Sequence, residues 1–250
     1  MQAQEGAFHL VSVETSQPTE RLAWERVRHH ATELAWPPEG VALHMTYGRT
    51  ASDSTNGVTV TVHYELYDGI PAMSKWITVE NRGERPVELD SFKSEILAVV
   101  EDTSRVEDRG LPYPTPSALH VETDYAMSGM TAANANRHGV HWREDPLYGT
   151  QVNYLRNTPC LLEVGPELGP AQTLEPGATF ESMRAFLLVQ DSTERERRGL
   201  ARRRLYRTVA PWVTENPLMM HVRFADDATC LLYTSPSPRD VEESRMPSSA

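Results

Sequence analysis

The feature that most constrains the fold is a strict two-residue alternation within the stretch Gly57–Asp90. Its apolar positions are Val58, Val60, Val62, Tyr64 and Leu66. The polar positions between them are Thr59, Thr61, His63, Glu65 and Tyr67. This period, with its Val, Thr and Tyr content, is typical of a half-buried β-strand. After a turn containing Gly69 and Pro71 the alternation resumes at 75–80, and a second turn leads into 87–89. Three successive antiparallel strands predict a meander and therefore a β-sandwich.

The composition fits one large, mainly β domain. The chain has 250 residues and 18 prolines, which favour short strands joined by loops. Its formal net charge of −11 argues against nucleic acid as a partner, because phosphate binding needs a basic surface. No apolar run is long enough to cross a bilayer, so we expect no membrane partner. Residues 1–10 lack the pattern of a signal peptide, and the compartment stays open. We expect no cofactor.

Further strands and one helix can be assigned from the remaining sequence. The expected strands are Phe8–Glu14, Val41–Tyr47, Ile96–Glu101 as an extension of the same sheet, Cys160–Val164, and one long strand from Phe180 to Leu188. Arg21–Arg28 is favoured as a further strand, with a short helical turn as the alternative. A helix is predicted after the N-cap candidates 191–193, with Ala201, Leu205 and Val209 as an apolar stripe that docks on the sandwich. Its arginines favour a solvated helix face over a nucleic-acid patch. Pro211 is expected to end the helix, and Leu218–Phe224 is expected to form a buried strand.

The least regular region, Thr123–Tyr154, holds the candidate ligand-binding residues. Aromatic rings stand there beside amides and carboxylates, a mixture that suits a sugar, because C–H faces stack on rings and hydroxyls bind amides and acids. The candidate sugar-binding residues are Asp124, Asn134, Asn136, His138 and Trp142. The alternative is a polar loop whose side chains satisfy its own backbone. His138 and His141 are a weak metal signal, since no third ligand is placed, and we expect no metal.

The last 21 residues and the two cysteines need a separate interpretation. Cys230–Asp240 back-translates codon by codon to a commonly used transposase-library sequencing adapter, and Ser244–Ala250 to the downstream end of the same adapter. We therefore expect natural sequence to end near Thr229, followed by a disordered tail without function. A natural Ser/Pro-rich tail is the alternative. Cys160, in the apolar run CLLEV, is expected to be a packed thiol without a disulfide.

Three segments resemble the N-terminal region of α-galactosidase-like glycoside hydrolases, the group of retaining α-galactosidases and raffinose synthases. They are VHYELYDGIPAMSKWITVEN (Val62–Asn81), DPLYGTQVNY (Asp145–Tyr154) and RERRGLARRRLYRTVAPWVTENPLMMH (Arg195–His221). The resemblance implies an antiparallel supersandwich of the galactose-mutarotase kind, followed by a (β/α)8 barrel. In that group the two catalytic aspartates lie on later barrel strands. No catalytic residue is therefore assigned in this chain.

These observations predict four parts and two classes of function. The parts are a β-sandwich domain at 1–190, a linker helix and linker at 191–217, the start of a truncated barrel at 218–229, and the adapter-derived tail at 230–250. The favoured function is the non-catalytic N-terminal domain of a glycoside hydrolase whose whole protein acts on carbohydrate, with a homo-oligomer as a further option. The alternatives are an autonomous carbohydrate-binding sandwich and a structural interaction module. Without a barrel, we expect the helix stripe and Leu218–Phe224 to lose their partners and make the fragment poorly soluble or oligomeric.

Overall fold

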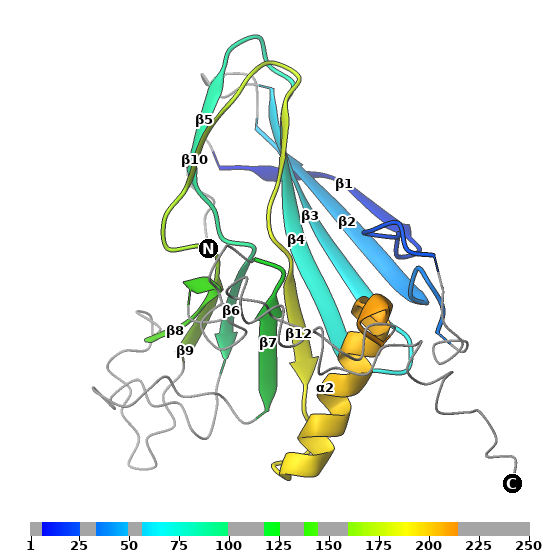
Figure 1. Cartoon of the computed structure of the whole chain (residues 1–250). Helices are drawn as coiled ribbons and strands as arrows, with labels where there is room; N and C mark the ends of the chain where they lie inside the picture. Colours follow the sequence, from blue (N-terminus) through cyan, green and yellow to red (C-terminus); the bar gives the residue numbers. More distant parts are fainter. Residues whose placement is uncertain are drawn as a thin grey trace, which may run out of the picture.

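The computed structural model describes residues 7–25, 34–49, 57–99, 118–125, 138–144 and 160–214. Its largest element is a seven-stranded antiparallel sheet, the main sheet (Figure 1). In spatial order its strands are β1 (His9–Ser16), β2 (Gly40–Gly48), β3 (Val58–Tyr67), β4 (Ala72–Asn81), β12 (Ala185–Val189) and β7 (Leu119–Thr123), and β11 (Thr179–Glu181) also pairs with β4. The prediction of a mainly β chain with antiparallel sheets is confirmed. The described part of the predicted strand Arg21–Arg28, residues 21–25, is not a strand.

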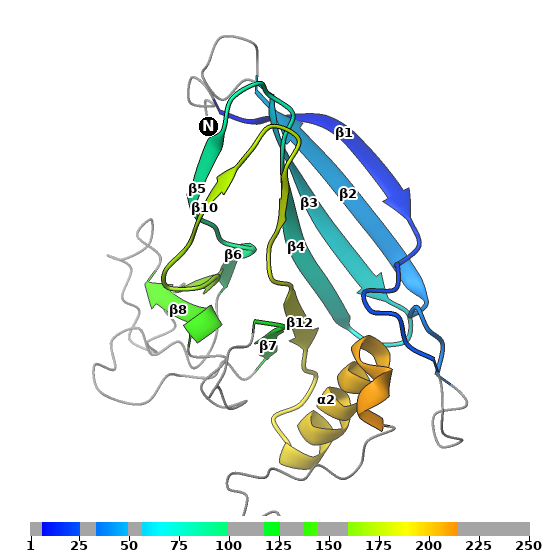
Figure 2. The same cartoon turned by 45° about the horizontal axis from the view of Figure 1, so that its top comes forward.

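Two smaller sheets flank the main sheet (Figure 2). One consists of β5 (Val87–Ser91) and β10 (Pro170–Leu174), and the other of β6 (Glu95–Val99), β9 (Cys160–Val164) and β8 (Val140–Glu144). The predicted meander is therefore right for β3 and β4 but wrong for its third strand, because β5 leaves the main sheet to pair with β10. The prediction that Ile96–Glu101 extends the main sheet is also wrong, because β6 pairs with β9 instead.

The hairpin of β3 and β4 is fixed by an unbroken pairing register and by a glycine beside its open end. All nine cross-strand pairs from Val58↔Asn81 to Leu66↔Met73 follow without a shift, so the apolar positions of both strands share one face. At the open end of the hairpin, just before β3, Gly57 has a φ of +98°, and a Cβ there would lie 2.5 Å from the backbone of Gly83. Only glycine fits this close approach.

The two faces of the main sheet are buried by different partners. The apolar face packs on the small sheets through Val121, Leu187 and Leu162 on one side and Val79 and Leu174 on the other. At the end of β3 the burial is reversed from the simple alternation: Leu66 is 49% exposed, whereas Glu65 and Tyr67 on the polar face are 3% and 5% exposed. The polar face is therefore the covered face at this end of the sheet.

The predicted long strand Phe180–Leu188 is two strands separated by a β-bulge. In β11, Glu181 pairs with Thr78, and in β12, Ala185 pairs with Lys75, so the β11–β12 side carries one extra residue. Ser182 holds the bulge, because its backbone N–H and its Oγ bond the C=O and N–H of Ile77 at 2.9 and 3.0 Å. A one-residue shift exchanges the faces of a strand. Phe180 accordingly packs with the apolar-face cluster, while Phe186 lies on the polar face.

One α-helix, α2 (Arg195–Val209), docks on the polar face and is followed by the short 3₁₀ helix η2 (Pro211–Thr214). Leu205 is 1% exposed and packs with Tyr67, Ala72 and Leu188, with Ala201 and Val209 beside it. The predicted stripe is confirmed, and the expectation that it lacks a partner is wrong, because the main sheet covers it. The N-cap residue is Glu194 rather than one of 191–193, although Ser192 Oγ accepts the Glu194 N–H at 3.1 Å.

Several sequence expectations lie outside the described residues. They concern the segments 215–229 and 230–250, and with them the Leu218–Phe224 strand and the tail. Within the described part of the chain, no helix combines the length and apolarity needed to cross a membrane.

Candidate functional site

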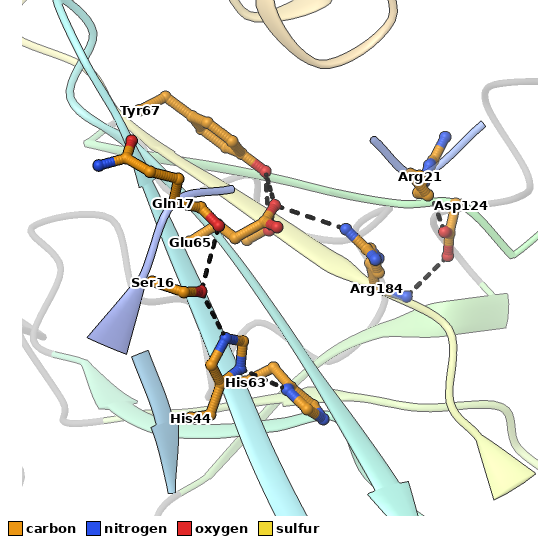
Figure 3. Close-up of polar contacts among 10 residues, drawn as sticks. Ser16, Gln17, Arg21, His44, His63, Glu65, Tyr67, Asp124 and Arg184 are labelled. Atoms are coloured by element: carbon orange, nitrogen blue, oxygen red, sulfur yellow. Dashed lines mark hydrogen bonds and ion pairs between the residues drawn. The ribbon is translucent and has the colours of Figure 1, made fainter. Parts of the chain in front are cut away.

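A buried carboxylate on the polar face forms the floor of the candidate site (Figure 3). Glu65 lies near the end of β3, where Tyr67 Oη and Ser74 Oγ reach the same oxygen, Oε2, at 2.9 and 3.4 Å. Tyr67 Oη also lies 2.8 Å from Ser74 Oγ. Burial, and then the Glu65 charge, raise the pKa of Tyr67, so its hydroxyl keeps its proton and serves as a donor.

The bulge places a guanidinium opposite this carboxylate. Arg184 is 7% exposed, and its Nη1 lies 3.4 Å from Glu65 Oε2. Its Cζ lies 3.7 Å from the ring centroid of Trp76, so the cation also packs on an aromatic face. Its Nε is buried and has no hydrogen-bond partner among the described residues. A buried N–H without an acceptor is costly, and this atom is therefore a donor available to a water or ligand.

Asp124 joins the rim of the site to its floor. It follows β7, and its Oδ1 accepts the backbone N–H of Arg184 at 2.7 Å. Its Oδ2 lies 2.7 Å from Arg21 Nη1, and these two side chains are 29% and 23% exposed. The rim ion pair is thus open to solvent while the Glu65–Arg184 pair is buried. Two carboxylates and two guanidiniums give the site no net formal charge.

Aromatic rings form the walls above these charges. Trp36 and Trp212 meet edge to face with centroids 5.2 Å apart, and Arg21 Cζ lies 5.6 Å from the Phe186 centroid and 6.0 Å from that of Trp212. A cavity of about 10 Å³ lies between Arg21, Trp36, Glu65, Tyr67, Arg184 and Phe186, together with Thr19, Pro38 and Val209. This is about the space that one water occupies, so the floor accepts a single hydroxyl-sized group.

Beside the site, a chain of hydrogen bonds crosses four strands. It runs from Ser16 Oγ to His44 Nε2 (3.0 Å), from His44 Nδ1 to His63 Nδ1 (2.8 Å), and from His63 Nε2 to Thr78 Oγ1 (2.9 Å). Because Ser16 Oγ donates to Gln17 O, it accepts from His44 Nε2. His44 Nδ1 then accepts from His63 Nδ1, and His63 Nε2 accepts from the Thr78 hydroxyl. Burial, His44 and Arg184 lower the pKa of His63 to about 4. His63 stacks on Trp76 with centroids 4.7 Å apart and so steadies the ring that packs on Arg184.

The structure places the sequence-predicted residues in three different settings. Asp124 lies in the site. His138 is exposed, and the adjacent Gly139 lies near Thr123, next to Asp124. Trp142 lies on β8 and packs against the core cluster of Leu162, and Asn134 and Asn136 lie outside the described residues.

Sequence reasoning missed the other charged residues of the site. Glu65 was assigned only as a polar position of an alternating strand, and Arg184 as one position of a long strand. Arg21 lay in a wrongly predicted strand. The available signal was the shared polar face of Glu65 and Tyr67, which alternation alone does not mark as buried. Among the described residues, no group of three or more His, Cys, Asp or Glu side chains is arranged to hold a metal ion.

Comparisons with known proteins give distant likenesses only. No protein-family model and no curated protein matches the chain. An α-galactosidase from Lactobacillus brevis superposes with a TM-score of 0.47 and 13% identity, over 80% of this chain and 29% of that chain. A GH36 α-galactosidase, AgaA of Geobacillus stearothermophilus, in complex with 1-deoxygalactonojirimycin, gives 0.44 and 14%, over 81% and 30%. A putative aldose 1-epimerase from Klebsiella pneumoniae gives 0.38 and 8%, over 69% and 56%.

These likenesses carry no argument about function, since every TM-score is below 0.5 and every identity below 25%. The chain spans less than a third of the length of the two α-galactosidases.

Proposed function

We propose that this chain is the β-rich domain of a carbohydrate-active enzyme of the α-galactosidase-like group, and that it binds a neutral sugar at the Asp124–Arg184 site. The observation that carries the sugar site is the combination of balanced charges and aromatic walls. Asp124 and Arg21 stand at the rim and Glu65 and Arg184 at the floor. Trp36 and Phe186 line the space between them, and Trp212 packs on Trp36 and near Arg21. The three segments that resemble the group support the assignment of the domain to it.

The charge balance favours a neutral ligand over an anion. An anion would meet Arg21 and Arg184, but also the carboxylates of Asp124 and Glu65, each already paired with a guanidinium. A hydroxyl both donates and accepts, and so matches a carboxylate and a guanidinium at once. The cavity limits what enters the floor to one such group, while the sugar ring rests against the tryptophans at the rim.

Arg184 Nε has a defined role in this proposal. Among the described residues this buried donor has no acceptor, and a hydroxyl oxygen in the cavity would satisfy it. The sugar hydroxyl would thereby replace the one water that the cavity accommodates. This contact would add specificity but would bury little surface area. We therefore expect a weak site, with a dissociation constant in the millimolar range.

Calorimetric titration of the full chain with methyl α-galactoside tests the sugar site. Wild type should give saturable heat, and Asp124→Asn should weaken binding about tenfold, the effect of roughly 1.4 kcal/mol. Asparagine keeps an oxygen that can accept the Arg184 N–H but loses the charge that holds Arg21. Arg203→Met, on the exposed surface of α2, is the control and should bind like wild type. No saturable heat in wild type, or equal affinity in Asp124→Asn, overturns the proposed site.

The assignment to an enzyme is tested separately by recovering the reading frame past Thr229. A run of βα units after that point supports a domain that works beside a catalytic barrel. A frame that continues through Cys230–Ala250 as authentic coding sequence to a natural stop refutes it. The chain would then be the second candidate, an autonomous carbohydrate-binding sandwich, for which the same Asp124–Arg184 site is the favouring observation.

A further inference from the structure

Helix α2 and the cavity of the candidate site share part of one buried cluster. Leu205 packs there with Tyr67 of the main sheet, and Val209 lies beside them. Tyr67 and Val209 also line the cavity. Tyr67 in turn donates its hydroxyl to Glu65 Oε2 at 2.9 Å, at the floor of the site (Figure 3). The seat of the helix on the main sheet is therefore continuous with the floor of the site.

The short helix η2 extends this contact to the aromatic wall. Trp212 meets Trp36 edge to face with centroids 5.2 Å apart, and Arg21 Cζ lies 6.0 Å from the Trp212 ring centroid. Trp36 and Arg21 line the cavity themselves. Ala210, the single residue between the two helices, donates its N–H to Tyr206 O at 2.9 Å. The position of Trp212 is thereby tied to the position of α2.

The seat of α2 on the main sheet is narrow. Within its 15 residues, all of which the structure describes, Leu205 is the buried one. At its sides Arg204 Nη2 donates to Gly69 O at 2.8 Å, and Tyr206 Oη donates to Glu122 Oε1 at 2.5 Å, and both bonds are exposed to solvent. Elements with few buried apolar contacts and exposed hydrogen bonds open at a lower free energy than the whole fold. By these criteria α2 is such an element.

We infer that α2 and η2, residues 195–214, form a strap whose docking is coupled to the ligand: the sugar binds the chain with the strap docked, and bound sugar in turn holds the strap on the sheet. The inference rests on the proposed sugar site and adds its regulation. There the sugar ring rests against Trp36 and Trp212, and one hydroxyl enters the cavity that Val209 lines. Undocking would remove Trp212 and Val209, so the undocked state binds sugar less tightly. A ligand shifts an equilibrium toward the state that it binds more tightly.

Hydrogen–deuterium exchange of the full chain tests the coupling. Amides of α2 that exchange through undocking should slow by a factor of one plus the ratio of free sugar to its dissociation constant. With methyl α-galactoside at about ten times its dissociation constant, this slowing is about elevenfold. In Asp124→Asn, whose binding should be about tenfold weaker, the same sugar concentration should slow these amides only about twofold.

Two results overturn the inference, and they differ in what they leave standing. Saturable heat of sugar binding together with unchanged exchange in α2 means that the sugar binds docked and undocked chains alike. That result removes the strap and leaves the sugar site. The absence of saturable heat removes the sugar site and the strap with it.

Leu205→Ala tests the same coupling through affinity. Leu205 is 1% exposed and does not line the cavity, so its truncation acts on the sugar only by undocking the strap in a larger fraction of molecules. Binding of methyl α-galactoside should weaken at least about tenfold. Leu200→Ala, on the same helix but 52% exposed, is the control and should bind like wild type.

Wild-type affinity in Leu205→Ala, with the circular dichroism of the sheets unchanged, would contradict the strap. Should Leu205→Ala fail to fold, the exchange measurement on the wild-type chain decides the question alone.

Discussion

Replacing Arg184 by Met should destabilise the fold strongly, because it leaves a buried carboxylate without its cation. Glu65 is 3% exposed and Arg184 Nη1 lies 3.4 Å from its Oε2. Removing one partner of a buried pair costs about 3–5 kcal/mol. The methionine keeps part of the packing of the arginine stem but loses the contact of the cation with Trp76. We therefore expect a loss of about 4 kcal/mol of unfolding free energy.

Urea unfolding followed by tryptophan fluorescence measures this loss. With a slope of about 2 kcal/mol per molar urea, the midpoint should fall by roughly 2 M. Glu65→Gln/Arg184→Met removes both charges and should recover about half of the loss, because a buried pair is often replaceable by neutral groups. Arg203→Met on exposed α2 surface should change stability by less than about 0.5 kcal/mol. A loss below about 1 kcal/mol for Arg184→Met, or no recovery in the double variant, would refute the reasoning.

Three further perturbations test the elements around the site. Leu205→Ala should lower the free energy of unfolding by about 2–5 kcal/mol in urea titrations. Leu200→Ala, on the same helix but 52% exposed, should lower it by less than about 0.5 kcal/mol. Equal losses would contradict the docking of α2. Tyr67→Phe should cost about 1–3 kcal/mol by removing the hydroxyl that reaches Glu65 and Ser74, with Tyr64→Phe as the control, and no loss would mean the hydroxyl is dispensable. The free energy of unfolding should fall as the pH falls from 6.5 toward 4, because His63 then binds a proton in the unfolded chain but not in the folded one. His63→Gln should flatten that decline in pH-dependent urea titrations, and an unchanged slope would count against it.

The regular elements follow from the sequence where one local pattern decides them. The alternation in Val58–Tyr67 predicts β3, and its register with β4 keeps both apolar sets on one face. The spacing of Ala201, Leu205 and Val209 predicts the buried stripe of α2. In both cases the residues that set the pattern are neighbours in the chain, so short-range periodicity contains the information.

The bulge between β11 and β12 is not visible in the sequence. Phe180–Leu188 alternates without interruption, so sequence reasoning assigns Phe180 and Phe186 to the same face. The extra residue is held by Ser182 bonding Ile77, which lies more than 100 residues earlier in the chain. This distant contact exchanges the faces and turns Arg184 toward Glu65.

The candidate site is only partly predictable for the same reason. The density of polar and aromatic residues after Thr123 identifies Asp124 as a candidate, but it gives no partner for it. Glu65 is typical of a solvent-facing strand position until α2 covers the neighbouring Tyr67 on that face. Burial of Tyr67, which bonds Glu65, therefore depends on a helix about 140 residues away, and no local signal reports it.

The most direct test of the proposed sugar site is a crystal structure of the full chain grown with a high concentration of methyl α-galactoside. The proposal predicts electron density for the sugar between Asp124 and the tryptophan pair Trp36 and Trp212, with one hydroxyl within hydrogen-bond distance of Arg184 Nε. Density only at another surface, or an Arg184 Nε that bonds nothing but water at saturating sugar, would contradict it.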